Sequence, residues 1–241
     1  MNFYEKLSTV YDTVFIYNEN THKLLRETLN LSRGERFLDV ACGTGTYSLA
    51  LNKDGFSGCG VDLDNKMIEI AKTKSNELNN LGFNTMDMRE INLQFHNTFN
   101  LIYCIGNSLV HLSNALEIEK AINDFYSILE ENGYILIQII NYDRILKNNI
   151  KNLPTIQKDN VDFVRNYDYK KDENKIYFNT ELRIQGDTNV YKGSTPLIPL
   201  KSKDLINIIK KCGFKDIEVF GDFKKSVFNI DSYGLIIRAC K

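Results

Sequence analysis

A glycine-rich turn stands between an apolar segment and a helix-like segment near the start of the chain, in FLDVACGTGTY from Phe37 to Tyr47. Gly43 and Gly45 allow the backbone to turn sharply and to approach a ligand with no side chain between them. The free N–H groups of the helix expected from Thr46 would point at such a ligand. A single GxG pair is weak evidence, but the order of strand, glycine turn and helix predicts a nucleoside-binding loop.

Three aspartates lie in or at the ends of three successive strand-like segments. Asp39 lies four residues before Gly43, Asp62 follows the next segment in CGVDLD, and Asp87 follows the third in NTMDMRE. Ligands bind at the carboxyl ends of the strands in folds with open parallel sheets. Asp62 could there accept hydrogen bonds from two ribose hydroxyls, and Asp87 from an adenine amino group. Each aspartate alone could instead be a helix cap or a turn residue.

The position of Asp39 favours a cationic ligand over a dinucleotide. A carboxylate beside the loop would repel a pyrophosphate, and Ser48 stands where the dinucleotide fingerprint has its third glycine. The same carboxylate could serve the sulfonium and ammonium groups of S-adenosylmethionine. We therefore predict S-adenosylmethionine as the cofactor, with Met67 and Met88 against its adenine ring. A nucleotide-linked oxidoreductase is the weaker alternative.

Strand-like and helix-like segments alternate over most of the chain, which predicts a doubly wound α/β fold. The run Tyr134–Ile140 (YILIQII) is almost continuously apolar, as expected for a strand with helices on both faces of its sheet. The other expected strands are 36–41, 58–61, 83–86, 99–105, 214–220 and 233–239. Three of the expected helices are 3–31, 46–52 and 202–212. A fourth is capped by Asp64 or Asn65 and has Ile68, Ala71 and Leu78 on one face. A fifth begins at about Asn114 and is ended by Asn132-Gly133.

The pattern changes between residues 151 and 199. Residues 174–184 (NKIYFNTELRI) alternate strictly between apolar and polar positions, and a similar period of two begins at Val161. Turn-rich stretches separate these runs, which predicts antiparallel strands with one wet face. We expect residues 1–150 and 200–241 to form the cofactor-binding domain and residues 151–199 to be an antiparallel β insertion before the final helix that acts as a lid.

Composition disfavours several other classes of protein. The chain has 30 Lys and Arg against 31 Asp and Glu, so it lacks the basic excess typical of nucleic-acid binding. It also lacks an apolar run long enough for a membrane span and an N-terminal signal peptide, which favours a cytoplasmic location. The spacing of its five cysteines and three histidines does not suggest a metal site.

These segments together resemble the class I S-adenosylmethionine-dependent methyltransferases over essentially the whole chain. DVACGTG is similar to the first motif of that family and GVDLD to its second, which adds Ala41 and Leu63 to the expected cofactor site. The resemblance implies a Rossmann-like sheet of seven strands whose last strand is antiparallel, and the final segment 233–239 suits that strand.

A closer resemblance is to the glycine and glycine/sarcosine N-methyltransferases. They carry motifs similar to CIGNSLVHL from Cys104, to NYDRIL from Asn141, and to Tyr11-Asp12 near the N-terminus. By that resemblance, Tyr11 would approach the sulfonium methyl group and Asn107 would line the acceptor pocket. Cys104 joins the expected cofactor-binding residues.

One position departs from that subgroup. An arginine just before the NYD-like segment grips the substrate carboxylate in the glycine N-methyltransferases, and this chain has Ile140 there. An aliphatic side chain cannot form a bidentate pair with a carboxylate. Either Arg144, Arg165 or Arg183 takes over that role, or the acceptor is not an amino acid, which we slightly favour.

The function predicted from these residues is methyl transfer from S-adenosylmethionine to a small molecule, with nitrogen as the acceptor atom. An oxygen or carbon acceptor of a non-amino-acid metabolite is an alternative and would more often need a base. His111 is the only histidine near a motif, although a structural residue at a helix start is the interpretation that we favour for it. A protein that binds the cofactor without turnover and a tRNA methyltransferase are further alternatives. The sequence does not indicate the oligomeric state.

Overall fold

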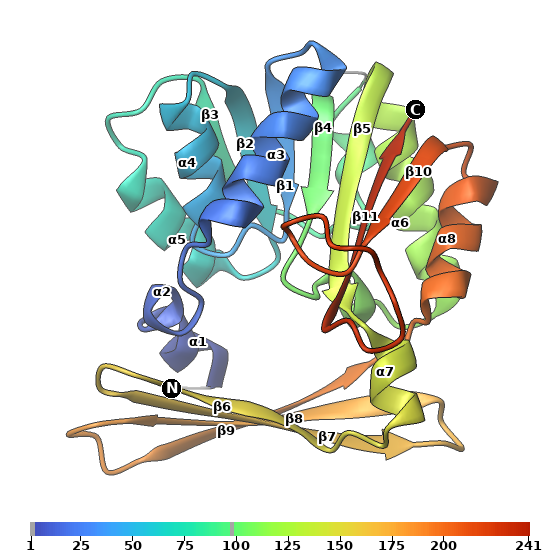
Figure 1. Cartoon of the computed structure of the whole chain (residues 1–241). Helices are drawn as coiled ribbons and strands as arrows, with labels where there is room; N and C mark the ends of the chain where they lie inside the picture. The colour runs from blue at the N-terminus through green and yellow to red at the C-terminus, as the bar shows by residue number, and fades with distance from the viewer. Residues whose placement is uncertain (1–2, 97–98) are drawn as a thin grey trace.

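Within residues 3–96 and 99–241, which the computed structural model describes, seven strands form one sheet in the order β10–β11–β5–β4–β1–β2–β3 (Figure 1). The strands β1 to β5 are parallel to one another, and β11 is antiparallel to both β5 and β10. The predicted Rossmann-like sheet with an antiparallel last strand is confirmed. Its strands are β1 (Arg36–Val40), β2 (Ser57–Asp62), β3 (Leu81–Thr85), β4 (Phe99–Cys104), β5 (Leu129–Ile140), β10 (Lys215–Phe220) and β11 (Gly234–Cys240).

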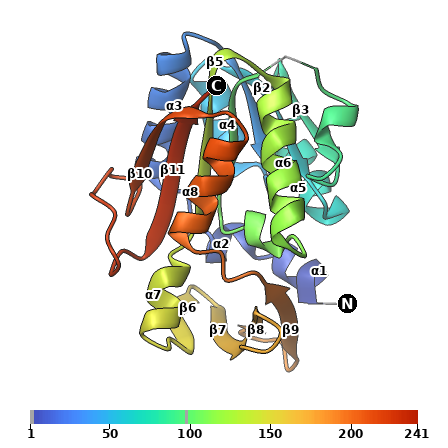
Figure 2. The ribbon, with the colours of Figure 1, turned by 90° about the vertical axis from the view of Figure 1, so that its right-hand side faces the viewer.

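Helices cover both faces of this sheet because its central strands are apolar on both sides. Helices α3 (Glu19–Ser32) and α4 (Thr46–Lys53) lie on one face, whereas α6 (Ala115–Ile128) and α8 (Ser202–Lys211) lie on the other (Figures 1 and 2). Phe37 packs in one apolar cluster with Leu25 of α3, and its neighbour Leu38 packs in another with Ile122 of α6. Helix α5 (Asn65–Lys74) packs against β2 and β3.

A second sheet, of four antiparallel strands among the described residues, lies below the carboxyl ends of the parallel strands in Figure 1. Its strands are β6 (Asn152–Lys158), β7 (Val161–Lys170), β8 (Lys175–Ile184) and β9 (Val190–Leu197). The predicted alternation is confirmed in β8, where Ile176, Thr180 and Leu182 are buried and Arg183 is exposed. The buried face is turned toward the large sheet.

The chain enters and leaves the second sheet at one place. Helix α7 (Tyr142–Lys147) leads into β6, and α8 begins soon after β9. The carboxylate of Asp143 in α7 accepts a hydrogen bond of 2.8 Å from the backbone N–H of Ser202 at the start of α8. This bond fastens the two ends of the inserted sheet together.

The N-terminal segment does not form the single helix 3–31 that the sequence predicts. It forms α1 (Phe3–Ser8), α2 (Tyr11–Val14) and then α3. The side chain of Asn18 caps α3 by accepting from the backbone N–H groups of Asn20 and Thr21, which ends any continuity with the preceding turns. Helices α1 and α2 therefore lie between the two sheets, and Phe3 stacks on Phe163 of β7 (Figure 1).

Two other predicted helix ends are wrong. Helix α5 begins after the predicted cap Asp64 but ends at Lys74, so Leu78 lies beyond it. Helix α6 begins after Asn114 as predicted, but it ends at Ile128 and continues directly into β5. Asn132-Gly133 instead lies in an irregular part of β5, where the pairing with β4 shifts register. The left-handed backbone of Asn132, with φ of 63°, suits such a bulge.

Within the described part of the chain, no helix is both long and apolar enough to cross a membrane. The same residues contain no group of three or more His, Cys, Asp and Glu side chains that could hold a metal ion. All five cysteines are free thiols.

Candidate active site

A cavity of about 570 Å³ lies where the carboxyl ends of β1 to β4 face the second sheet and the N-terminal helices. This volume is in the range of pockets that hold small molecules, roughly 300–1,000 Å³. The strand ends supply one wall, α1 and α2 supply Phe3, Leu7 and Tyr11, and the second sheet supplies Phe163 and Thr180. The predicted residues that line it are Tyr11, Ala41, Gly43, Asp62, Leu63, Met67, Asp87, Met88 and His111.

The glycine loop needs glycine at both predicted positions. Gly43 and Gly45 have left-handed backbones, with φ of 56° and 78°. A Cβ on Gly45 would lie 2.6 Å from the ring of Phe83, and a Cβ on Gly43 would lie 3.0 Å from the ring of Tyr11. The loop is therefore held closely from both sides, and Tyr11 lies over Gly43 at the wall of the cavity.

The carboxylate of Asp62 is fixed by backbone donors. Its Oδ2 accepts a hydrogen bond of 2.8 Å from the N–H of Gly43, and its Oδ1 accepts one of 2.9 Å from the N–H of Asp64. Burial raises the pKa of Asp62, although these donors oppose the shift. Each carboxylate oxygen has further acceptor capacity, so a ligand with two neighbouring hydroxyls could bond to both.

Asp87 lies in the same cavity with a cationic neighbour that the sequence analysis missed. Both oxygens of Asp87 accept from Nε of Arg89 at 3.0 Å. These hydrogen bonds hold the pKa of Asp87 below its usual value, although burial acts the other way. Asp87 therefore stays ionised and remains an acceptor for an amino group. The Arg89 interaction spans only two residues of a turn, and the sequence offered no periodic pattern to reveal it.

Asp39 lies behind the loop and is not among the residues that line the cavity. Side chains alternate along β1, so Asp39 shares the face of Phe37 and points toward α4. It accepts a hydrogen bond of 2.7 Å from the hydroxyl of Ser48. Burial raises the pKa of Asp39 to about 7, against the effect of that hydrogen bond. A direct contact between Asp39 and a ligand remains a prediction that this geometry does not favour.

Three other predicted site residues, Gly45, Cys104 and Asn107, are not among the described residues that line the cavity. Cys104 is buried, and the Asn107 side chain is bonded within the protein. Its Oδ1 accepts from the N–H of Ile140 at 2.9 Å, and its Nδ2 donates to the hydroxyl of Tyr142 at 3.0 Å. Asn107 therefore positions the end of β5.

His111 lines the cavity from the turn η2 (Leu109–His111). Burial lowers the pKa of His111 below its ordinary value of 6.5, so the imidazole is neutral at pH 7. A neutral imidazole can accept a proton, so its position and ionisation are compatible with a role as a base.

Comparison with known proteins finds similarity to methyltransferases. A family model described as "Methyltransferase domain" matches residues 37–133, from β1 into β5. The glycine/sarcosine N-methyltransferase of Aphanothece halophytica is 29% identical over 211 residues, which are 85% of this chain and 76% of that protein. The human glycine N-methyltransferase is 32% identical over 126 residues, 46% of this chain and 43% of that one.

Residues 37–133 therefore match a methyltransferase domain, and these similarities support a class I S-adenosylmethionine-dependent methyltransferase. A solved methyltransferase of this kind from Clostridium acetobutylicum covers 99% of both chains with a TM-score of 0.82 and 16% identity. The CcbJ methyltransferase from Streptomyces caelestis has the same TM-score at 15% identity and covers 99% of this chain and 97% of that one. These structures support the fold.

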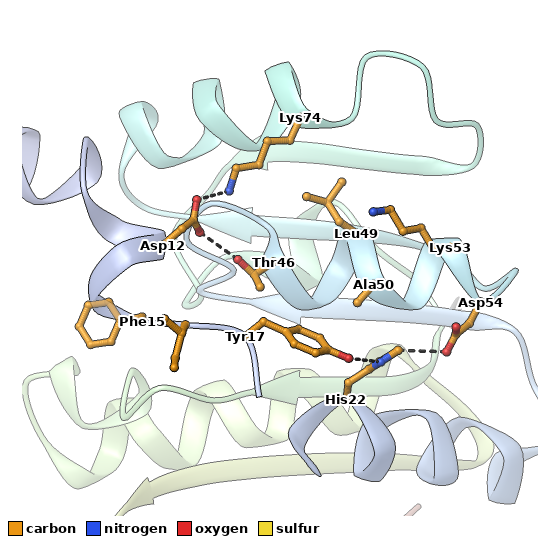
Figure 3. Close-up of a pocket in the computed structure, with 11 residues that line it drawn as sticks. Asp12, Phe15, Tyr17, His22, Thr46, Leu49, Ala50, Lys53, Asp54 and Lys74 are labelled. Carbon is orange, nitrogen blue, oxygen red and sulfur yellow. Dashed lines mark hydrogen bonds and ion pairs between the residues drawn. The ribbon is translucent and has the colours of Figure 1, made fainter. Parts of the chain in front are cut away.

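In the methyltransferase, Asp12 fastens α2 to the glycine loop. Its Oδ1 accepts from the hydroxyls of Thr44 at 2.6 Å and Thr46 at 3.1 Å, and its Oδ2 pairs with Lys74 of α5 at 2.5 Å. Figure 3 shows Asp12 between Lys74 and Thr46. These bonds hold Tyr11 against Gly43.

Replacing Asp12 by alanine should weaken binding of S-adenosylhomocysteine to the methyltransferase by about tenfold, as expected for loss of a charge-assisted contact. Burial acts to raise the pKa of Asp12, but the bonds from Lys74 and Thr44 lower it overall. The Asp12 carboxylate is therefore ionised and bonded above pH 3.8, the ordinary pKa of an aspartate. Its bonds are lost as the pH falls through the lower pKa of Asp12 in the folded protein. Isothermal titration calorimetry should therefore show the same loss of affinity in Asp12→Ala at every pH between 6 and 8.

Lys74→Gln is the matched control for Asp12, because it removes the ion pair and keeps both hydroxyl bonds. It should lose less affinity than Asp12→Ala, since exposed ion pairs contribute little. Equal losses in the two variants would contradict the assignment of the hydroxyl bonds.

A shallow groove on the outside of α4 continues from Asp12 along the segment that joins α2 to α3 (Figure 3). There the hydroxyl of Tyr17 lies 2.7 Å from Nδ1 of His22, and Nε2 of His22 lies 3.0 Å from Asp54. These contacts anchor the segment to α3 and to the end of α4.

The buried carboxyl group of Asp39 should make the stability of the methyltransferase depend on pH. Its pKa is raised from 3.8 to about 7, so the folded state retains a proton that the unfolded state releases. Stability should therefore fall as pH rises between these values, by at most about 1.4 kcal/mol per pH unit. Urea unfolding from pH 4.5 to 7.5 should show a steeper fall in the wild type than in Asp39→Asn.

The exposed Asp172 provides the control for this comparison, because Asp172→Asn should retain the wild-type slope. A slope in Asp39→Asn that equals the wild-type slope would show that Asp39 is ionised in the folded protein throughout this range.

Proposed function

We propose that the methyltransferase transfers the methyl group of S-adenosylmethionine to a nitrogen atom of a small-molecule amine. The observation that carries the proposal is the carboxylate of Asp62, fixed between Gly43 and Asp64 in a cavity of suitable size. The name of the Aphanothece halophytica relative, a glycine/sarcosine N-methyltransferase, supports nitrogen as the acceptor atom.

In this proposal, the cofactor lies along the ends of β1 to β3. Asp62 accepts from its ribose hydroxyls, and Asp87 accepts from its adenine amino group. Met67 and Met88 pack against the adenine, while the backbone at Ala41, Gly43 and Leu63 follows the ligand closely. Asp39, Gly45 and Cys104 support the loop and the strand ends from beneath.

Residues 151–199 form a lid over the methyltransferase domain of residues 1–150 and 200–241 in the same proposal. Phe163 and Thr180 of the second sheet line the cavity together with Tyr11 from the N-terminal segment. Two separate parts of the chain therefore keep water from the reacting groups. This exclusion matters because it strengthens electrostatic interactions inside the site.

When bound, S-adenosylmethionine supplies an electrophilic methyl group on a sulfonium. The task of the protein is to align an acceptor lone pair with that group. Tyr11 is placed to do so because its ring lies over Gly43. Burial and the nearby carboxylates Asp62 and Asp39 raise the pKa of the Tyr11 hydroxyl, so it stays protonated and can donate a hydrogen bond. Asn107 positions the neighbouring strand end.

Methylation of a hydroxyl group is the second candidate, and His111 is the observation that favours it. Its neutral imidazole lines the cavity and could accept the hydroxyl proton. His111→Gln should then abolish turnover with a hydroxyl acceptor, whereas an amine acceptor that arrives unprotonated should react at nearly the wild-type rate.

The proposed function is tested by incubating the protein with S-adenosylmethionine labelled in its methyl group and a panel of amines, amino acids, phenols and acids. Label should appear on a nitrogen atom, as identified by mass spectrometry of the product. Label found solely on oxygen or carbon would overturn the nitrogen assignment. Tight binding of S-adenosylhomocysteine without transfer to any acceptor would favour a binding protein instead.

A further inference from the structure

A second cavity, of about 450 Å³, lies at the carboxyl end of β5. It is bounded by β5 and the start of β11 on one side and by α7, β6 and β7 on the other. The segment between β10 and β11 closes it, and Figure 1 shows this segment in front of the sheet. Leu153, Pro154, Phe223 and Ile236 make much of its lining apolar.

Two arginines from different elements reach this cavity. Arg165 comes from the inner face of β7 and Arg144 from α7. The guanidinium of Arg144 lies 4.2 Å from the ring centroid of Tyr233, in a cation–π contact. Arg165 donates from Nη2 to the backbone oxygen of Pro154 at 2.6 Å. Two positive charges are thus held at one wall.

Arg165 has unused hydrogen-bonding capacity. Its Nε is buried and has no hydrogen-bond partner among residues 3–96 and 99–241. Burial also lowers the pKa of its guanidinium, which reflects the removal of this charge from water. An unbonded buried donor on a charged group is unfavourable, and in native proteins it calls for an explanation such as a ligand.

The cavity also contains one carboxylate, that of Asp222, but this group is bonded within its own loop. It accepts from the backbone N–H groups of Lys224 and Ser226 and from the hydroxyl of Ser226. The net charge of the ionised side chains that line the cavity is therefore positive, and the arginines have no carboxylate partner among the described ion pairs.

Two residue pairs connect this cavity with the cofactor cavity. Gln138 lines the second cavity and accepts at 2.7 Å from the N–H of Gly106, which lines the first. Arg165 lies directly opposite Thr180 in the pairing of β7 with β8, and Thr180 lines the first cavity. The two cavities are therefore neighbours below the same sheet edge.

We propose that the second cavity binds the methyl acceptor through an anionic group, a carboxylate or a phosphate, held by Arg165 and Arg144. This inference rests on the proposed amine methylation and names the class of amine. The second cavity, at about 450 Å³, is larger than an acceptor of glycine's size needs. Pockets of roughly 300–1,000 Å³ hold drug-sized ligands. The acceptor is therefore an amine larger than glycine with an anionic end.

The test uses ω-amino acids of increasing length, from glycine through β-alanine and 4-aminobutyrate to 5-aminovalerate, each paired with the amino alcohol of the same length. O-phosphoethanolamine, paired with ethanolamine, distinguishes phosphate from carboxylate. Binding is measured by calorimetry on protein saturated with S-adenosylhomocysteine, with inorganic phosphate as an additional probe. Methyl transfer is measured on the same compounds.

The expected result is that an anionic member longer than glycine binds about tenfold to a hundredfold more tightly than its neutral partner. Arg165→Gln should remove that difference and leave binding of S-adenosylhomocysteine unchanged. Arg144→Gln provides a second variant if Arg165→Gln fails to fold. Arg183→Gln is the matched control, because Arg183 lies exposed on β8 and pairs with Glu181 at 3.0 Å.

Equal binding of the anionic and neutral partners, or equal behaviour of Arg165→Gln and Arg183→Gln, would overturn the inference. So would failure of every anionic probe, inorganic phosphate included, to bind to the cofactor-saturated protein. If anionic amines bind through Arg165 but no amine is methylated, the anion site stands and the proposed function fails. If neutral amines are methylated as well as the anionic ones, the proposed function stands and the anion site fails.

Discussion

Asp62→Ala is expected to weaken binding of S-adenosylhomocysteine by about a hundredfold or more. The variant removes the proposed acceptor of two ribose hydroxyls, and a hydrogen bond to a charged group contributes about 1.5–3 kcal/mol. It also releases the N–H groups of Gly43 and Asp64, which are both bonded to this carboxylate. Calorimetry with the purified variant measures the loss directly.

Two further variants separate the ligand contact from an effect on folding. Asp62→Asn keeps one acceptor oxygen and should show an intermediate loss of affinity, while Asp172→Ala, on an exposed turn of the second sheet, should bind normally. Unfolding curves establish whether Asp62→Ala is folded at the temperature of the titration. A folded Asp62→Ala that binds as tightly as Asp172→Ala would remove the basis of the proposed cofactor position.

Gly45→Ala is expected to lower the free energy of unfolding by about 2–5 kcal/mol. The left-handed backbone contributes about 1–2 kcal/mol of strain, and overpacking contributes about 1–3 kcal/mol. The new methyl group would lie 2.6 Å from the ring of Phe83 and 3.2 Å from Cβ of Ala71. Denaturant unfolding with linear extrapolation measures the change.

Gly55→Ala isolates the conformational part of this effect. Gly55 also has a positive φ, of 98°, but no described atom lies within 4 Å of an added Cβ. Gly55→Ala should therefore lower the free energy of unfolding by only about 1–2 kcal/mol. If Gly45→Ala and Gly55→Ala lose the same stability, the contact with Phe83 does not contribute, and the glycine loop is less closely packed than its geometry indicates.

Much of the site could be predicted because strand ends in a parallel sheet meet at one edge. Asp62 and Asp87 follow successive strands, and the structure brings both into one cavity with Gly43. Asp39 shows the limit of that reasoning. It was assigned from its distance to the loop along the chain, whereas its orientation follows from alternation along β1, which places it with Phe37 on the face of α4.

The parts that could not be predicted depend on contacts between distant segments. The alternation in β7 and β8 predicts a buried face, but it does not show that Phe163 and Thr180 of that face line a cavity with Tyr11. The division of the N-terminal segment depends in the same way on tertiary contacts, because Asp12 bonds to Thr44 and Lys74 far along the chain.

Asn132-Gly133 was misassigned for a different reason. This dipeptide commonly ends a helix or forms a turn, because both residues tolerate a left-handed backbone. Here the same tolerance is used inside β5, where the pairing with β4 changes register. Local preference gave the correct backbone conformation but the wrong element.

The bond between Asp143 and Ser202 has a consequence for how this enzyme can diversify. Because the inserted sheet starts and finishes at a single fastening point, its length and composition can change during evolution without displacing the strands that carry Gly43, Asp62 and Asp87. Under the proposed function, new acceptor preferences can then arise from changes in one contiguous stretch of the gene, while the proposed cofactor-binding strand ends keep their arrangement.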